Sequence, residues 1–222
     1  MQERTLTLRT IRPILIVVAM VGGIASPAAG QLAARPAEEW IKLLDSPERV
    51  AGLKIDEIVA ALHLKPGSVV ADLGAGSGLF AAPLSQAVGE KGTVYAVDID
   101  SKLLDHINER VKQQGIGNVQ TVLGQFGDPK LPSTNVDLAF IHDVLHHIED
   151  KPGYLKQAVR YLAPSGRIAI VEPDAKKGPH ADNPKLQVTK DELDGWMANV
   201  GFVRSEEIPL SEAKWYLIYR RK

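Results

Sequence analysis

Imidazole and carboxylate side chains are concentrated between residues 142 and 147. This short segment contains His142, Asp143, His146 and His147, and so holds three of the six histidines of the chain. An imidazole titrates near neutral pH and can remove a proton from a hydroxyl, amine or ring. Imidazoles and carboxylates are also ligands for divalent ions. The segment therefore predicts a general base or a metal site, against the plainer alternative that the histidines pack, cap or meet a cofactor.

The spacing of these residues matters for both kinds of chemistry. If the chain turns helical at Asp143, then His146 and His147 follow three and four positions later, on the same helical face as Asp143. His142 would stay at the end of the preceding strand. A second polar segment, residues 172–180, ends with a further histidine. It offers three more candidates for the same pocket, or forms a solvated loop, and these candidates are Glu172, Asp174 and His180.

A glycine-rich turn is the second feature with chemical meaning. The sequence Asp72-Leu73-Gly74-Ala75-Gly76-Ser77-Gly78 places glycines at alternate positions. Such a turn lets the backbone approach a ligand closely, and the helix that follows presents unpaired N–H groups there. Asp98 lies about 20 residues further on, where a carboxylate can accept hydrogen bonds from both hydroxyls of a ribose. The turn therefore predicts a nucleoside site, although the Leu79 side chain opposes the G-x-G-x-x-G pattern of nicotinamide oxidoreductases.

These residues need a framework of alternating strands and helices. Apolar runs predict five strands, and amphipathic runs between them predict helices at residues 78–88, 102–114 and 154–162. The strands are expected at residues 68–72, 94–98, 119–123, 136–142 and 167–172. Two more helices, broken at Ser46-Pro47, are expected within residues 37–62.

The tail of the chain completes the expected sheet. A helix over residues 189–200 should begin with a capping box of Thr189 and Glu192. Strands at residues 202–209 and 214–220 should form an antiparallel hairpin. The predicted fold is α/β, a Rossmann-like doubly wound sheet of seven mostly parallel strands with an antiparallel C-terminal hairpin.

At this point the chain resembles the class I S-adenosylmethionine-dependent methyltransferases, from about residue 53 to the C-terminus. The glycine-rich turn matches the family's first motif, and three further motifs follow in order at residues 94–100, 136–140 and 162–168. The resemblance implies S-adenosyl-L-methionine as the cofactor. It implies that Asp72 and the backbone of Gly74, Ala75, Gly76 and Gly78 approach the methionine part of that cofactor.

The same resemblance assigns the nucleoside part. Asp98 would hold the ribose hydroxyls and Ile99 would contact the adenine. Gln125 replaces the usual aspartate after the third strand, and its amide would accept a hydrogen bond from the adenine amino group. Phe126 would either stack on the ring or pack in the core. His142, at the end of the fourth strand, is also taken as a cofactor-binding candidate.

Asp143, His146 and His147 are the catalytic candidates. A similarity to the quinone-pathway and small-RNA O-methyltransferases, which carry Glu-x-x-Glu-His at this place, implies a divalent metal as the alternative, with His180 as a possible fourth ligand. Two of those family residues are replaced here by Asp143 and His146. This softer set would suit zinc or manganese better than magnesium.

Composition restricts the acceptor. The net charge of −1 gives no electrostatic reason to expect nucleic acid as a partner. The chain has no cysteine, which excludes disulfides, thiolate metal sites and the thiolate binding of arsenite. A small-molecule acceptor is therefore expected.

The N-terminus has the order of a secretory signal peptide. Arginines at positions 4, 9 and 12 precede the apolar run 14–24, and small residues follow up to Gly30. We expect residues 1–30 to be removed, which leaves 31–222 as the methyltransferase domain with N-terminal helices over 31–64. The protein would be periplasmic or secreted, without stable membrane insertion after cleavage; the alternative is an inner-membrane anchor. Because S-adenosylmethionine is not ordinarily made outside the cytoplasm, a non-catalytic exported nucleoside-binding or interaction module is the second hypothesis.

Overall fold

The computed structural model describes residues 35–222, so the expected leader, residues 1–30, lies outside the described residues. Its centre is a seven-stranded sheet with the order β3-β2-β1-β4-β5-β7-β6. The strands are β1 (Val69–Leu73), β2 (Thr93–Asp98), β3 (Val119–Leu123), β4 (Val136–His142), β5 (Leu162–Pro173), β6 (Phe202–Ile208) and β7 (Lys214–Arg221). Strands β1 to β5 pair in parallel, and β7 is antiparallel to both β5 and β6. The predicted fold class is confirmed.

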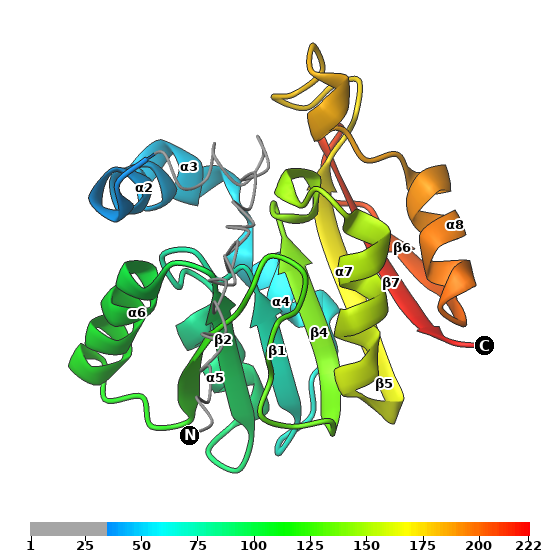
Figure 1. The fold of residues 1–222 in the computed structure, drawn as a ribbon. Coiled ribbons are helices and arrows are strands. Elements are labelled where there is room, and N and C mark those ends of the chain that lie inside the picture. The colour runs from blue at the N-terminus through cyan, green and yellow to red at the C-terminus, as the bar shows by residue number, and fades with distance from the viewer. Residues whose placement is uncertain (1–34) are drawn as a thin grey trace, which may run out of the picture.

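Helices cover both faces of the sheet (Figure 1). The α-helices are α2 (Ala37–Leu44), α3 (Pro47–Gly52), α4 (Ile55–Ala61), α5 (Ala81–Val88), α6 (Ser101–Gln113), α7 (Lys151–Ala158) and α8 (Lys190–Asn199). Three 3₁₀ turns are η1 (Leu145–His147), η2 (Val159–Tyr161) and η3 (Pro184–Leu186). Among the described residues, none of these helices has both the length and the apolar character required to cross a membrane.

Strand β4 shows how the two layers are specified. Leu138 and Phe140 pack into the cluster with α4 and α5, whereas Ala139 and Ile141 pack into the cluster with α7 and α8. All four side chains are buried. A strand buried on both faces must be apolar throughout, since successive side chains point to opposite sides. This explains the uninterrupted apolar run that marked the strand in the sequence.

Helices α2 and α3 lie beyond the edge at which the parallel strands end (Figure 1), whereas α4 packs against a face of the sheet. The predicted break at Ser46-Pro47 is present, with Ser46 as N-cap residue and Pro47 at the first position of α3, but the Ser46 side chain makes no capping hydrogen bond. A second break at Lys54, whose φ is 53°, divides the expected second helix into α3 and α4. The region therefore contains three short helices rather than two.

The predicted capping box at the start of α8 is confirmed. The Glu192 amide donates to Thr189 Oγ1 at 3.2 Å, and the Thr189 amide donates to Glu192 Oε2 at 3.0 Å. These two bonds satisfy amides that the helix itself leaves without acceptors.

Candidate functional site

The glycine-rich turn connects β1 to α5 at the carboxyl edge of the sheet. Gly74 has a φ of +84°, a conformation that L side chains rarely adopt. A Cβ atom at this position would lie 2.4 Å from the Cγ2 atom of Val144, in the segment after β4. The turn therefore requires glycine for both its backbone angle and its packing against the neighbouring segment.

Asp98 lies at the end of β2 and faces this turn, as the sequence predicts. Its Oδ2 atom accepts a hydrogen bond from the Gly76 amide at 2.9 Å, and its Oδ1 atom accepts from the Asp100 amide at 3.1 Å. Burial raises the pKa of this carboxyl, although the backbone amides oppose the shift. The carboxylate is thus fixed beside the turn.

Asp72 is a buried carboxyl without a full set of partners. Only 2% of the residue is exposed, and its Oδ2 atom accepts no hydrogen bond from the described residues. Burial, and then the nearby charge of Asp98, raise the pKa of Asp72 to about 7. A buried polar atom without a partner is costly, and such groups concentrate at functional sites. Asp72 is therefore suited to receive a cation or a hydrogen-bond donor from a ligand.

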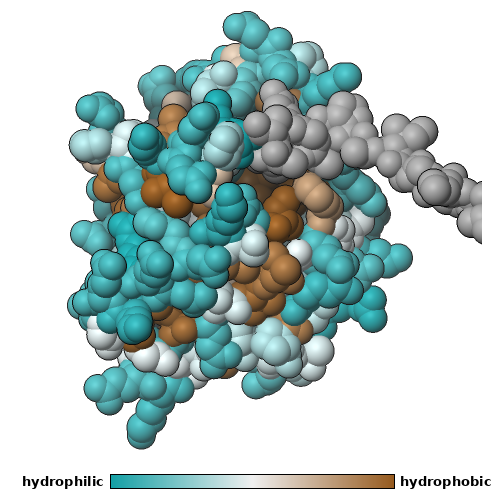
Figure 2. Space-filling view, turned by 60° about the vertical axis from the view of Figure 1, so that its left-hand side comes forward, coloured by the Kyte–Doolittle hydropathy of each residue, from teal (hydrophilic) through white to brown (hydrophobic). Residues whose placement is uncertain are grey.

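An apolar surface borders the same edge of the sheet, where β2 and β3 end. Ile99, Leu123 and Phe126 are 37%, 56% and 55% exposed, and Gln125 beside them is also exposed. Leu123 pairs with Asp98 in the sheet register. Figure 2 shows apolar residues gathered near the centre of this side of the molecule, with hydrophilic residues around them. Phe126 is therefore not a core residue, and Leu123 is a candidate that the sequence reasoning missed.

The N-terminal helices are tied to the turn by apolar and polar contacts. A Cβ atom at Gly76 would lie 2.9 Å from Leu44 Cδ1, so the end of α2 covers the turn. Ser77 Oγ donates to Asp45 Oδ1 at 2.6 Å. Arg110 of α6 reaches Asp45 Oδ2 at 3.1 Å and the Ser77 carbonyl oxygen at 3.2 Å. These partners are far apart in the sequence, and no local pattern identifies them.

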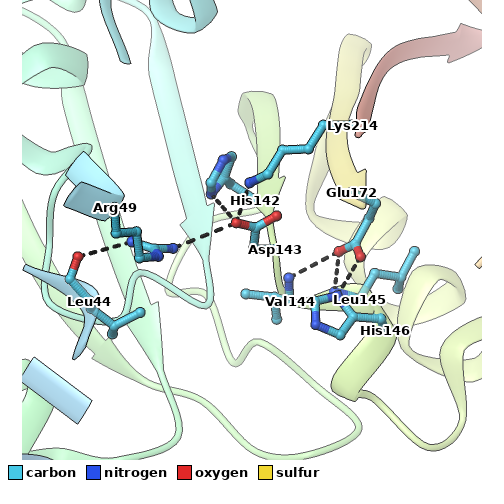
Figure 3. A network of polar contacts seen from close by, with 9 residues as sticks. All are labelled: Leu44, Arg49, His142, Asp143, Val144, Leu145, His146, Glu172 and Lys214. Atoms are coloured by element: carbon cyan, nitrogen blue, oxygen red, sulfur yellow. Dashed lines mark hydrogen bonds and ion pairs between the residues drawn. The ribbon is translucent and has the colours of Figure 1, made fainter. Parts of the chain in front are cut away.

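Asp143 is held by basic groups from other elements (Figure 3). Lys214 of β7 donates to its Oδ2 atom, Arg49 Nη2 of α3 lies 3.6 Å from the same atom, and His142 Nδ1 lies 3.7 Å from it. Burial alone would raise the pKa of Asp143, but His142, Lys214 and Arg49 outweigh burial and lower it. Asp143 is therefore an ionised centre that joins α3, β4 and β7.

His142 is buried in an aromatic environment rather than exposed to the turn. Its ring centroid lies 4.9 Å from that of Phe80 and 6.2 Å from that of Phe140. Its Nε2 atom has no hydrogen-bond partner among the described residues. Burial lowers the pKa of His142 to about 4, so the ring is neutral at neutral pH. The packing interpretation fits this histidine.

The chain does not turn helical at Asp143, so the condition for placing Asp143, His146 and His147 on one helical face is not met. Asp143 has a φ of +55°, which ends the strand in a left-handed conformation, and a 3₁₀ turn follows as η1. His146 and His147 lie on this turn, and His180, from the segment between β5 and α8, joins them. One ring nitrogen from each of the three histidines lies within 4.8 Å of the other two. Asp143 is not part of this group.

Glu172 of β5 accepts hydrogen bonds from the segment that carries His146 and His147. Its Oε1 atom accepts from the Val144 amide at 3.0 Å and from the Leu145 amide at 2.6 Å, and its Oε2 atom lies 2.5 Å from His146 Nδ1 (Figure 3). Glu172 is completely buried, so the solvated interpretation does not hold for this residue. Asp174, in contrast, accepts from amides of its own loop and stays outside the cluster.

Comparison with known proteins is consistent with this geometry. A family model described as a methyltransferase domain matches residues 64–217. A ubiquinone/menaquinone biosynthesis C-methyltransferase of Vibrio vulnificus is 35% identical over 109 residues, which are 49% of this chain and 42% of that protein. An arsenite methyltransferase of Halobacterium salinarum is 29% identical over 162 residues, 73% of this chain and 41% of that protein. The chain thus matches less than half the length of these relatives.

The fold has close counterparts among solved structures. A SAM-dependent methyltransferase from Aquifex aeolicus superposes with a TM-score of 0.76 at 23% identity, covering 85% of this chain and 100% of that one. A sarcosine dimethylglycine methyltransferase from Galdieria sulphuraria, described as provisional in function, gives a TM-score of 0.65 at 18% identity, covering 78% and 87% of the two chains. These likenesses concern the arrangement of the sheet and its helices.

Proposed function

The chain belongs to the class I S-adenosylmethionine-dependent methyltransferase family, and from this premise we propose that it transfers a methyl group from S-adenosylmethionine to a small-molecule acceptor. The observation that carries the proposal is the contact between Asp98 Oδ2 and the Gly76 amide, 2.9 Å long. It brings a carboxylate and a ligand-approaching turn together at the carboxyl edge of the sheet, where open α/β folds bind nucleotides.

The residues around this contact offer groups that suit the ribose and the adenine of S-adenosylmethionine. Asp98 would accept from the ribose hydroxyls, and the exposed apolar surface of Ile99, Leu123 and Phe126 matches the adenine ring. Gln125, exposed beside them, has an amide oxygen that can accept from the adenine amino group.

Asp72 would accept a hydrogen bond from the ammonium of the methionine part, because its buried Oδ2 atom has no hydrogen-bond partner within residues 35–222. The backbone of residues 74–78 would line the same part of the donor. When bound, S-adenosylmethionine supplies an electrophilic methyl group on a positively charged sulfur. Two carboxyls at the turn favour a cationic ligand.

The acceptor side is assigned to η1 and the segment after β5. Methyl transfer depends mainly on positioning and on the exclusion of water, so few catalytic groups are needed. We assign proton removal, where the acceptor carries a proton, to His146 or His147. Burial and the neighbouring histidines lower the pKa of His147 to about 4, so it is unprotonated at neutral pH. Asp143 would position this segment through its ion pairs rather than remove a proton itself.

The relatives suggest different acceptors, and the chain favours an organic one. One relative is named for quinone biosynthesis and another for arsenite. The chain has no cysteine with which to bind trivalent arsenic. Its net charge of −1 gives no support for a polyanionic acceptor.

Export is part of the proposal. The arginines, apolar run and small residues of positions 1–30 support cleavage after Gly30 and release outside the cytoplasm. Cell fractionation with N-terminal sequencing tests this: the mature chain should begin near Gln31 and be found in the periplasm or medium. An uncleaved chain that sediments with the inner membrane would instead support the anchored alternative.

Transfer of a labelled methyl group tests the activity. The protein, labelled S-adenosylmethionine and fractionated extracts should yield a labelled small molecule. Asp98→Ala should abolish that label, whereas the matched control Asp105→Ala, on the exposed face of α6, should not. If the wild-type protein binds S-adenosylhomocysteine but labels nothing, the non-catalytic binding module is the better description. If the wild-type protein does not bind S-adenosylhomocysteine, the turn is neither the donor site of a methyltransferase nor that of a nucleoside-binding module.

A further inference from the structure

Three histidines from two separate segments, one after β4 and one after β5, lie close together. His146 and His147 are adjacent on η1, and His180 lies in the long connection between β5 and α8. The ring centroids of His146 and His147 are 4.0 Å apart, and that of His180 is 4.9 and 5.9 Å from them. We propose that these three imidazoles bind one divalent transition-metal ion, with Zn²⁺ as the expected species.

The distances are close to those of a formed site. Zinc binds imidazole nitrogen at about 2.0–2.1 Å, so two nitrogens of a tetrahedral site lie about 3.4 Å apart. The three candidate nitrogens of the cluster are already within 4.8 Å of one another. Rotation of the partly exposed His147 and His180 side chains toward the buried His146 would bring the set to binding distance. The protein backbone therefore needs little rearrangement.

The buried Glu172 provides a second reason to expect a metal. A carboxylate has no proton to donate, so His146 Nδ1 must donate in their 2.5 Å contact. This leaves His146 Nε2 free to act as a ligand. Histidine ligands in metal sites commonly donate their other ring N–H to a carboxylate, which fixes the ring and strengthens the ligand.

Glu172 is itself rigidly held. Its other oxygen accepts from the amides of Val144 and Leu145, which lead into η1 (Figure 3). The orienting carboxylate and the ligand-bearing turn are thus parts of one hydrogen-bonded unit.

Metal binding requires the free lone pair of a neutral imidazole. Three rings that lie this close together can offer three such lone pairs to one divalent ion.

The donor set indicates the kind of ion. An all-imidazole set suits zinc, copper or nickel, whereas magnesium and calcium prefer oxygen. Three protein ligands leave a coordination position open in a tetrahedral zinc site. That position would take water or an acceptor oxygen; only this last assignment rests on the proposed function. The ion would also hold the segment after β5 to η1. Within that segment, Gln187 Nε2, at the end of η3, donates to the His180 carbonyl oxygen at 3.2 Å.

Metal titration tests the site without any assay of methyl transfer. The full chain, purified without a histidine tag and stripped with a chelator, is titrated with Zn²⁺ by calorimetry and with Co²⁺ by visible absorption. We expect one ion per chain and cobalt bands of a four-coordinate site. His180→Ala should weaken binding at least about 100-fold, and Glu172→Gln about 10- to 100-fold, since loss of an outer-sphere partner has that effect.

The matched control is His63→Asn, which removes an exposed histidine outside the cluster and suits the positive φ of 48° there. Its zinc affinity should equal that of the wild type. Zinc should also raise the Tm of wild type and control, but not that of His180→Ala. Equal zinc affinities of wild type and His180→Ala, or no saturable binding by the wild type, would overturn the proposal and leave proton removal as the role of the cluster.

S-adenosylhomocysteine binding, measured on the same samples, separates this proposal from the proposed function. If the wild-type protein binds S-adenosylhomocysteine but shows no saturable metal binding, only the metal site is refuted. If Glu172→Gln does not fold, the metal site is tested by His180→Ala alone. His180 lies in a loop and is partly exposed, so we expect this variant to fold.

Discussion

Replacement of Asp72 by asparagine should stabilise the ligand-free protein at alkaline pH while weakening donor binding. Burial and the charge of Asp98 raise the pKa of Asp72 from 3.8 to about 7. A folded-state pKa above the unfolded value means that the folded protein keeps a proton that the unfolded chain has lost. The free energy of unfolding therefore decreases as pH rises from about 4 to about 7.

The magnitude follows from the size of the shift. One pKa unit corresponds to about 1.4 kcal/mol, so the ionised Asp72 costs the folded state about 4 kcal/mol above pH 7. At pH 5 only about 2 kcal/mol of this cost is present, because the folded protein still holds the proton. Asp72→Asn carries no charge at either pH. Its stability relative to the wild type should therefore improve by about 3 kcal/mol between pH 5 and pH 8.

Urea denaturation of both proteins at pH 5 and pH 8 measures this difference, and the subtraction removes the titration of all other groups. Asp105→Asn, on the exposed face of α6, is the control and should show no pH-dependent advantage. The same Asp72→Asn protein should bind S-adenosylhomocysteine more weakly at pH 8, because the ammonium loses its carboxylate. A stability difference that stays constant between the two pH values would refute the description of Asp72 as a buried acid without compensation.

Three further substitutions test the surroundings of the turn. Gly74→Ala should lower the free energy of unfolding by about 2–4 kcal/mol in urea denaturation, because of its positive φ and the contact with Val144; an unchanged midpoint would contradict this. Phe126→Ala should leave the Tm unchanged but weaken S-adenosylhomocysteine binding about tenfold in calorimetry, since aromatic stacking on a base contributes about 1–3 kcal/mol; a lower Tm would indicate a packing role instead. Lys214→Met should destabilise the protein by about 2 kcal/mol above pH 5, because it removes a cation that pairs with the partly buried Asp143; equal stability at that pH would mean that the ion pair contributes nothing.

The sequence predicts the framework well because the framework depends on local patterns. Apolar runs predict five strands, and the five parallel strands occur there. The capping box of Thr189 and Glu192 could also be predicted from the sequence, because its two residues are only three positions apart. Asp98 could be located for the same reason: a strand end at a fixed distance after the turn determines its position.

The site is less predictable wherever it depends on distant contacts. The helical turn considered at Asp143 does not occur; the Asp143 side chain instead pairs with Lys214 and Arg49, which lie far away in the sequence. The role of Glu172 as the partner of His146 depends on a pairing across 26 residues.

The cover of the turn by α2 depends likewise on contacts between Asp45 and residues 32 and 65 positions away. Apolar patterning identifies α2 as amphipathic, but it does not say which surface the helix covers. Sequence spacing identifies such side chains as candidates but does not pair them.

Titration of the full chain with S-adenosylhomocysteine by calorimetry is the most direct measurement of the central claim. The wild-type protein and Asp105→Ala should bind one molecule per chain with the same affinity, and Asp98→Ala should give no binding heat while its Tm shows that it is folded. Equal binding by Asp98→Ala and wild type, or no binding by the wild type, would contradict the assignment of the glycine-rich turn and Asp98 as the donor site.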